Sequence, residues 1–214
     1  MSSDLLEHSP DTKPNPNPDL GHDLPIRERQ RLATRNRIFD VALAEIAERG
    51  LAGVRIEHVA RKAGVTRPTI YAHFPAREDF LRELQRRSEA SALEAVRARM
   101  TGKRRGHFLH RFADATLDLL DGAHPVLRRE SFALMLREPR TEEWMGNALF
   151  GFLQAEIEKG QAQGEIPNQL PPRALTRTVM TALFGFFVLE GEAPATRKKQ
   201  AHQLLDLLVG ETKK

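Results

Sequence analysis

Apolar side chains recur every three or four residues along most of the chain, the spacing that places them on one face of an α-helix. Phe39, Ala42 and Ile46 show this period ahead of Gly50, and it resumes after later Gly or Pro breaks. No alternation of apolar and polar residues is long enough to predict a strand. The pattern predicts an all-α chain of about nine helices: one ending near residue 49, then 56–63, one ending before Pro75, 77–100, 107–120, 126–137, 141–163, 172–190 and one from 194 to 209.

A sharp turn separates the second and third predicted helices. Gly64 can adopt the positive φ that ends a helix, because it has no Cβ to clash with the backbone. Thr66 offers a hydroxyl that caps the next helix, and Pro68 fits its first turn, where the backbone N–H has no partner to lose. The helix that follows buries Ile70 and Phe74. Two helices joined in this way form a helix-turn-helix motif.

The outward face of the helix after this turn has the chemistry of a nucleic-acid contact. It carries Arg67, Thr69, Tyr71 and His73, and it has no carboxylate of its own. Guanidinium, hydroxyl and imidazole groups suit the phosphate backbone and the base edges of DNA. The segment is therefore interpreted as a recognition helix. The alternative is a helical hairpin with a glycine corner that binds no DNA.

The motif also resembles that of a known family. The string A-G-V-T-R-P-T-I-Y-A-H-F at residues 63–74 is similar to the signature of tetracycline-repressor (TetR) family regulators, and the resemblance extends from about Arg31 to Leu84. Many members have Thr or Ser where this chain has Arg55. In the family a basic residue at the start of the fourth helix pins the DNA backbone, and Arg77 matches it. The predicted DNA contacts are Arg55, Thr66, Arg67, Pro68, Thr69, Tyr71, His73 and Arg77.

The resemblance implies three regions. Residues 1–26 are expected to form a disordered, acidic and proline-rich arm, 27–82 the helix-turn-helix DNA-binding domain, and 83–214 a helical ligand-binding and dimerisation domain. The implied function is transcription regulation, with repression as the family default. Such a protein binds a palindromic double-stranded DNA operator as a homodimer and is released by a small effector. Beyond Leu84 only this architecture carries over from the family.

Charge and composition agree with this interpretation. Lys and Arg outnumber Asp and Glu by five in residues 27–82, whereas residues 1–26 carry a net charge of −4. The positive excess therefore lies on the segment that holds the motif. The chain has no cysteine, so disulfides and thiolate metal sites are excluded. Its first residues lack the apolar core of a secretory signal, and its longest apolar run, 179–189, is too short to span a bilayer. We expect a cytoplasmic protein with no membrane partner.

Aromatic and methionine residues are spread over the predicted helices of the second region. Ordinary core packing explains any single one of them, whereas the family usually holds an apolar ligand cavity among the corresponding helices. A mostly apolar lining favours a hydrophobic effector, and no cluster of charges points to another class. The predicted ligand-binding residues are Phe108, Phe112, Phe132, Met135, Trp144, Met145, Leu149, Phe152 and Phe184.

The last two predicted helices are more apolar than a single core face requires. Gly185 would let another helix approach closely. Similar C-terminal helices in the family pair across a twofold axis as a four-helix bundle, so a homodimer is expected. The predicted interface residues are Leu175, Val179, Leu183, Phe186, Phe187, Leu204, Leu205 and Leu208.

The sequence offers little support for other chemistry. His107, His110 and Asp114 could share one helix face as metal ligands, but a polar helix face explains them better, and we predict no metal and no cofactor. The chain has no nucleophile elbow, phosphate loop or zinc-protease motif, so no catalytic residue and no enzymatic activity are predicted. Two alternatives stay open. One is a helical binding protein or enzyme that has lost operator recognition, and the other is an architectural DNA binder without sequence preference.

Overall fold

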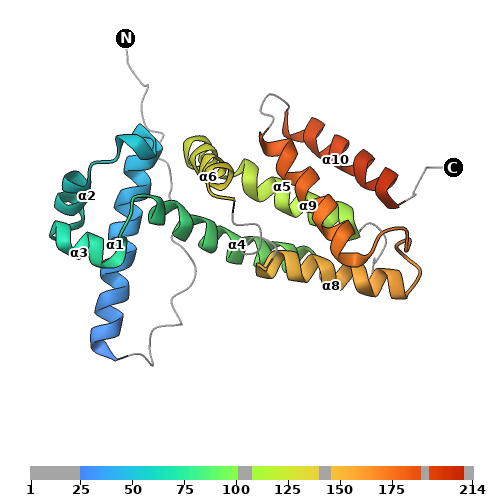
Figure 1. Ribbon diagram of the computed structural model, residues 1–214, viewed down its shortest axis with the longest axis horizontal. Helices are drawn as coiled ribbons and strands as arrows, with labels where there is room; N and C mark the ends of the chain where they lie inside the picture. The colour runs from blue at the N-terminus through green and yellow to red at the C-terminus, as the bar shows by residue number, and fades with distance from the viewer. Residues whose placement is uncertain (1–24, 101–107, 140–145, 189–192, 210–214) are drawn as a thin grey trace, which may run out of the picture.

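The computed structural model describes residues 25–100, 108–139, 146–188 and 193–209. Those residues form helices, one short 3-10 turn and no strand, which confirms the predicted fold class (Figure 1). The elements are α1 (Ile26–Arg49), η1 (Leu51–Gly53), α2 (Ile56–Ala63), α3 (Arg67–His73), α4 (Glu78–Met100), α5 (Phe108–Asp121), α6 (Pro125–Arg137), α8 (Ala148–Ala162), α9 (Pro172–Val188) and α10 (Pro194–Val209).

The first three helices and the start of α4 enclose an N-terminal core at one end of the molecule (Figure 1). The ring of Phe74, just after α3, lies 4.7 Å from that of Phe80 and 6.4 Å from that of Phe39, measured between centroids. Phe74 therefore ties the end of α3 to both α1 and α4. Ile70 is fully buried beside them, as the helical spacing predicts.

A second core fills the other end of the molecule (Figure 1). It is built by the second half of α4 together with α5, α8, α9 and α10. Phe112, Leu153 and Val179 are fully buried there. These helices therefore form a bundle with its own apolar interior.

Two helices join the cores. The predicted boundary between residues 82 and 83 falls inside α4, which runs unbroken through it, so the two regions are connected by a helix and not by a linker. On α6, Leu134 is buried in the N-terminal core, while Phe132 packs against the second core. Arg82 on α4 donates a hydrogen bond to Glu138, just after α6, at 2.6 Å. A shift of α4 or α6 would therefore be felt in both cores.

The largest difference from the predicted boundaries lies before α8. The predicted helix 141–163 is described only from residue 146, since residues 140–145 lie outside the described ranges, and within that part α8 begins at Ala148. Asn147 is extended, and its side-chain oxygen accepts the N–H of Phe150 at 2.7 Å, which makes it the N-cap. In the described parts of the chain, no helix is both long and apolar enough to cross a bilayer.

Candidate DNA-binding face and ligand cavity

The turn between α2 and α3 has the geometry that its residues predict. Gly64 adopts φ 63° and ψ 38°, in the left-handed region, and the N–H of Val65 returns to the carbonyl of Ala60 at 3.0 Å. Thr66 caps α3, because its hydroxyl oxygen accepts the N–H of Thr69 at 3.4 Å and lies 2.8 Å from the Thr69 hydroxyl. The start of α3 is therefore fixed by local hydrogen bonds.

Most of the predicted DNA contacts lie on the surface. Tyr71 is 44% exposed. Thr69 is half-buried beside its cap. Arg55 occupies the N-cap position of α2 without making a side-chain cap, so its guanidinium extends from the surface. The other exposed members of the set are Thr66, Arg67, Pro68 and Arg77.

His73 differs from the prediction that it turns outward. Its side chain is half-buried, and its Nδ1 atom is buried without a hydrogen-bond partner among the described residues. Burial, with the positive charges of Arg31 and Arg35 nearby, lowers the pKa of His73 below its ordinary value. A neutral imidazole at this position leaves Arg67 as the strong cationic donor on the outward face of α3.

The outward face of α3 has no carboxylate of its own, but a carboxylate from α2 reaches it. Glu57 Oε1 lies 3.0 Å from Arg67 Nη1, and both side chains are more than half exposed. Such a solvated ion pair contributes little to stability, so Arg67 can exchange this partner for another. The sequence contains both residues, but their approach depends on the angle between α2 and α3.

A buried glutamate near the start of α4 helps to fix the position of α3. Glu83 accepts hydrogen bonds from Arg86 Nη2 and Arg87 Nε, each at 2.8 Å, and from Arg35 Nη2 at 3.3 Å. Arg35 also donates to the carbonyl of His73, the last residue of α3, and its guanidinium lies 4.2 Å from the ring centre of Phe74. Arg35 thereby links α1, the end of α3 and α4.

The ionisation of Glu83 follows from these contacts. Burial alone would raise the pKa of its carboxyl group, but the hydrogen bonds and positive charges of Arg86 and Arg87 lower it to about 2. Glu45 in α1 plays the same part for α2, because it is buried and lies 2.8 Å from His58 Nδ1 and 3.1 Å from Lys62 Nζ. Burial opposes ionisation there too, and hydrogen bonds from Lys62 and His58 lower its pKa.

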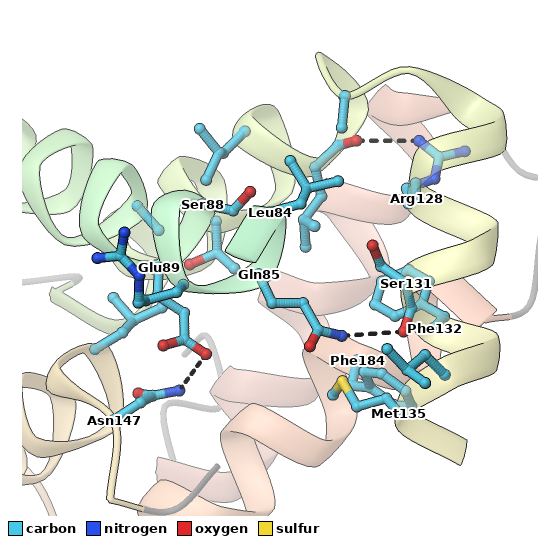
Figure 2. Close-up of a pocket in the computed structure, with 18 of the residues that line it drawn as sticks. Leu84, Gln85, Ser88, Glu89, Arg128, Ser131, Phe132, Met135, Asn147 and Phe184 are labelled. Carbon is cyan, nitrogen blue, oxygen red and sulfur yellow. Dashed lines mark hydrogen bonds between the residues drawn. The ribbon is translucent and has the colours of Figure 1, made fainter. Parts of the chain in front are cut away.

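A cavity of about 810 Å³ lies between α4, α5, α6 and α9. Four of the predicted ligand-binding residues line it, namely Phe132, Met135, Leu149 and Phe184. Figure 2 shows three of them, Phe132, Met135 and Phe184. Phe108, Phe112 and Phe152 instead pack in or against the second core, away from its wall. Trp144 and Met145 lie outside the described residues.

Of the helices around the cavity, α4 supplies the most polar side chains, and sequence reasoning missed them. Gln85 donates a hydrogen bond to the carbonyl of Ser131 on α6 at 3.1 Å (Figure 2). Asn147 Nδ2 lies 3.4 Å from Glu89 Oε1, and burial raises the pKa of Glu89 above its ordinary value. On an isolated helix these side chains look like a solvated face, and only the approach of α6 and α9 encloses them.

Residues 38–84 match the family model described as bacterial regulatory proteins of the tetR family. This N-terminal segment belongs to the tetR family of bacterial regulatory proteins. It is 38% identical over 58 residues to the HTH-type transcriptional regulator AcrR of Shigella flexneri, an alignment that covers 27% of each protein. It is also 45% identical over 42 residues to the HTH-type transcriptional repressor SCO4008 of Streptomyces coelicolor, covering 20% of this chain and 22% of that one. These alignments thus span about a quarter of either relative's length.

Solved structures of tetR-like proteins match over most of the chain. GusR of Salmonella enterica has a TM-score of 0.66 at 20% identity and covers 84% of this chain and 96% of its own. A transcriptional regulator from Saccharomonospora viridis, solved in complex with choline, has a TM-score of 0.62 at 21% identity and covers 82% of this chain and 96% of its own. At these identities the likeness shows the fold alone, and that shared fold extends beyond the matched N-terminal segment.

Four of the predicted dimer residues are used inside a single chain. Leu175, Val179, Leu183 and Leu205 are buried in the second core, because α9 and α10 pack there against α8 and α5. They therefore do not present an apolar surface to a partner. Phe186, Leu204 and Leu208 are half-buried, and the side chain of Phe187 lies outside the described residues. The exposed apolar side chains of these helices are instead Val188 and Leu207, at 42% and 73% exposure.

His110 and Asp114, two of the three residues considered as metal ligands, have other partners. His110 Nε2 lies 2.8 Å from Asp206, and His202 Nε2 lies 2.9 Å from Asp114, so both pairs join α5 to α10. The two imidazole rings stack with centroids 4.3 Å apart. His107 is not among the described residues, and those that are described hold no group of three or more side chains suited to a metal.

Proposed function

We propose that this chain is a DNA-binding transcriptional repressor that binds a palindromic operator as a homodimer and is released when a small, largely apolar effector fills the cavity. In this proposal residues 27–82 bind DNA, and residues 83–214 bind the effector and the second subunit. The observation that carries it is the exposed outward face of α3, held in place by the turn at Gly64, the cap at Thr66 and the bond from Arg35 to its last carbonyl.

The contacts follow from the chemistry of that face. In the proposed complex α3 enters the major groove, where Arg67 can donate two hydrogen bonds to a guanine and Pro68 can touch a thymine methyl. Thr66, Thr69 and Tyr71 supply hydroxyl groups for base edges and nearby phosphates, with His73 at the rim of the face. Arg55 and Arg77 contact phosphates on either side, which orients the helix without reading sequence.

Dimerisation is proposed through the exposed strip of α9 and α10. Leu207 and Val188 are its large apolar members, and a Cβ added to Gly185 would meet no atom within 4 Å, so a partner helix can approach closely there. Half-buried Phe186, Leu204 and Leu208 border the strip. A twofold dimer would present two recognition helices to half-sites about one helical turn, or ~34 Å, apart.

Release by an effector is proposed to act through the helices that the two cores share. The cavity is lined by Gln85 and Glu89 of α4 and by Phe132 and Met135 of α6, and both helices also contact the N-terminal core. A ligand that binds more tightly when α4 and α6 are displaced would favour that arrangement. Operator affinity would then fall by as much as the ligand's affinity differs between the displaced and undisplaced arrangements. A ligand present in the solved complex of the Saccharomonospora viridis protein supports a binding role for this fold.

The proposal is tested by selecting bound duplexes from a randomised DNA library with the full chain at near-physiological salt. Recovery of one palindrome with half-sites about one turn apart would support a sequence-specific dimer. Recovery of no consensus, with affinity that falls steeply as salt rises, would leave only the electrostatic attraction of a basic surface and overturn the proposal. Sedimentation of the same protein at micromolar concentration as a monomer would remove the dimer from it.

A further inference from the structure

One carboxylate on the cavity wall has no cationic partner among the residues that the structure describes. Glu89 is half-buried on α4, and its hydrogen bond comes from the neutral amide of Asn147 at 3.4 Å, which is long for such a bond (Figure 2). No ion pair found among the described residues includes Glu89. A carboxylate that has lost part of its water without gaining a cation is unfavourable unless something else neutralises it.

The arginines on the same wall are already engaged. Arg82 lies 2.6 Å from both Asp79 and Glu138, and Arg86 lies 2.8 Å from Glu83. Neither guanidinium can turn to Glu89 without leaving a carboxylate that holds it. The pKa of Glu89 is raised by burial, in keeping with a negative charge that its surroundings do not compensate.

The opposite side of the cavity is aromatic and apolar. Phe132 of α6 and Phe184 of α9 meet edge to face, with ring centroids 5.0 Å apart and planes at 87°. Figure 2 shows these rings and Met135 across the cavity from Glu89 and Asn147. Aromatic faces attract cations as well as apolar groups, so both walls favour a ligand that carries positive charge on an apolar body.

We infer that the cavity binds an organic cation with an apolar body, a hydrophobic amine or quaternary ammonium compound, whose charged centre lies against Glu89 and whose body lies against Phe132 and Phe184. The inference rests on the proposed function, since it assigns a chemical class to the effector of the same cavity. It restricts the hydrophobic effector class expected from the sequence to molecules that also carry a positive charge. A volume of about 810 Å³ leaves room for such a molecule.

The test is calorimetric binding of two probes with the same chain length to the full protein without DNA. Decyltrimethylammonium, used below its micelle concentration, carries the positive charge, and decanol is its neutral counterpart. Wild-type protein should bind the cation roughly 10- to 100-fold more tightly than Glu89→Gln, because the charge-assisted contact is lost. Decanol should bind both proteins within about twofold of each other, since its contacts are apolar.

Glu138→Gln is the matched control. It removes another carboxylate of the cavity wall, but one already neutralised by Arg82, so cation affinity should stay within about twofold of wild type. Equal affinity of wild type and Glu89→Gln for the cation would overturn the inference. So would decanol binding the wild type as tightly as the cation, or a wild type that binds neither probe.

DNA binding separates this inference from the proposed function. The cation could bind through Glu89 while the operator complex persists at a saturating concentration of the cation. That result would support the inferred ligand class and contradict release of DNA by this ligand. If the selection yields a palindrome while neither probe binds the wild type, DNA recognition stands and the organic-cation site is wrong.

Discussion

Glu83 and Glu89 lie on the same helix, α4, and meet opposite surroundings. Glu83 belongs to the N-terminal core, where Arg35, Arg86 and Arg87 hold it and bring its pKa to about 2. Glu89 lines the cavity, where the amide of Asn147 donates its hydrogen bond and burial raises its pKa. The contacts of Glu83 hold α1 and α4 in place, whereas Glu89 keeps a carboxylate oxygen that a ligand in the cavity can contact.

The comparison extends to the two regions as wholes. In the N-terminal region, local caps and buried ion pairs at Glu45 and Glu83 hold α2 and α3 in one position, which a reader of base edges requires. The second region surrounds an open volume with polar groups that face it, which a receptor for a small molecule requires. Matched substitutions in the two regions test whether they differ in this way.

The largest effect is expected from Glu83→Gln. It leaves Arg35, Arg86 and Arg87 without their carboxylate, so the free energy of unfolding in urea should fall by roughly 2–4 kcal/mol. Glu89→Gln on the same helix is the control, and it should leave stability unchanged or slightly raised because its carboxylate has no cation to lose. Similar losses in both variants would contradict the contrast.

The same pair predicts a difference in acid stability. The folded-state pKa of Glu83 is about 2, below its ordinary value of 4.5, so its contribution to stability is present above pH 4.5 and is lost as the pH falls toward 2. Urea unfolding at several pH values should therefore give a flatter profile for Glu83→Gln than for wild type over that range. A profile of equal slope would show that this carboxylate is not held ionised.

The next largest effect is expected from Arg67→Ala, which tests the outward face of α3. If Arg67 contacts a guanine, operator affinity should fall by about 1–3 kcal/mol while affinity for random DNA changes less. Arg173→Ala, which removes the same charge from an exposed position at the start of α9, should alter both affinities equally and slightly. Equal losses on operator and random DNA for Arg67→Ala would make it a backbone contact.

A smaller effect is expected from Gly64→Ala in the turn. A Cβ there meets no atom within 4 Å, so the cost comes from the positive φ of 63° alone and should be about 1–2 kcal/mol of unfolding free energy. Gly151→Ala in α8 also finds open space but has a helical backbone, so it should stabilise the chain by about 0.5–1 kcal/mol. Equal losses of unfolding free energy in Gly64→Ala and Gly151→Ala would contradict this account.

The smallest effect is the pH dependence of cation binding at Glu89. Because its pKa is raised, decyltrimethylammonium should bind less tightly as the pH falls, and the decline should begin at a higher pH than for an ordinary glutamate. The other charged or titratable side chains that line the cavity are His124, Arg82, Arg86, Arg128 and Glu138. Glu89→Gln isolates its contribution, and a decline that persists unchanged in this variant would contradict the assignment to Glu89.

Local chemistry explains what could be predicted in the N-terminal region. Gly64, Thr66 and Pro68 specify the turn through φ, a cap and a first-turn position, and each depends only on close neighbours in the chain. The helical period identified the buried Ile70 and Phe74 for the same reason. The pairing of Glu57 with Arg67 was missed, because it depends on how α2 crosses α3.

The cavity residues could be predicted only in part. Phe132 and Phe184 were found by their aromatic character, but Phe108, Phe112 and Phe152 share that character and pack elsewhere. Apolar side chains fill cores and line cavities alike, so composition does not separate the two uses. The same ambiguity placed Leu175 and Val179 at a dimer interface, although their own chain buries them.

The sequence by itself determined the helices, the turn at Gly64 and the chemistry of the face of α3, because these depend on backbone preferences and on spacing along one helix. The tertiary structure decided which polar residues are paired and which are left facing the cavity. Glu83 and Glu89 look alike in the sequence, and only the packing of α1 against one end of α4, and of α6 and α9 around the other, makes one a structural ion and the other a candidate ligand group.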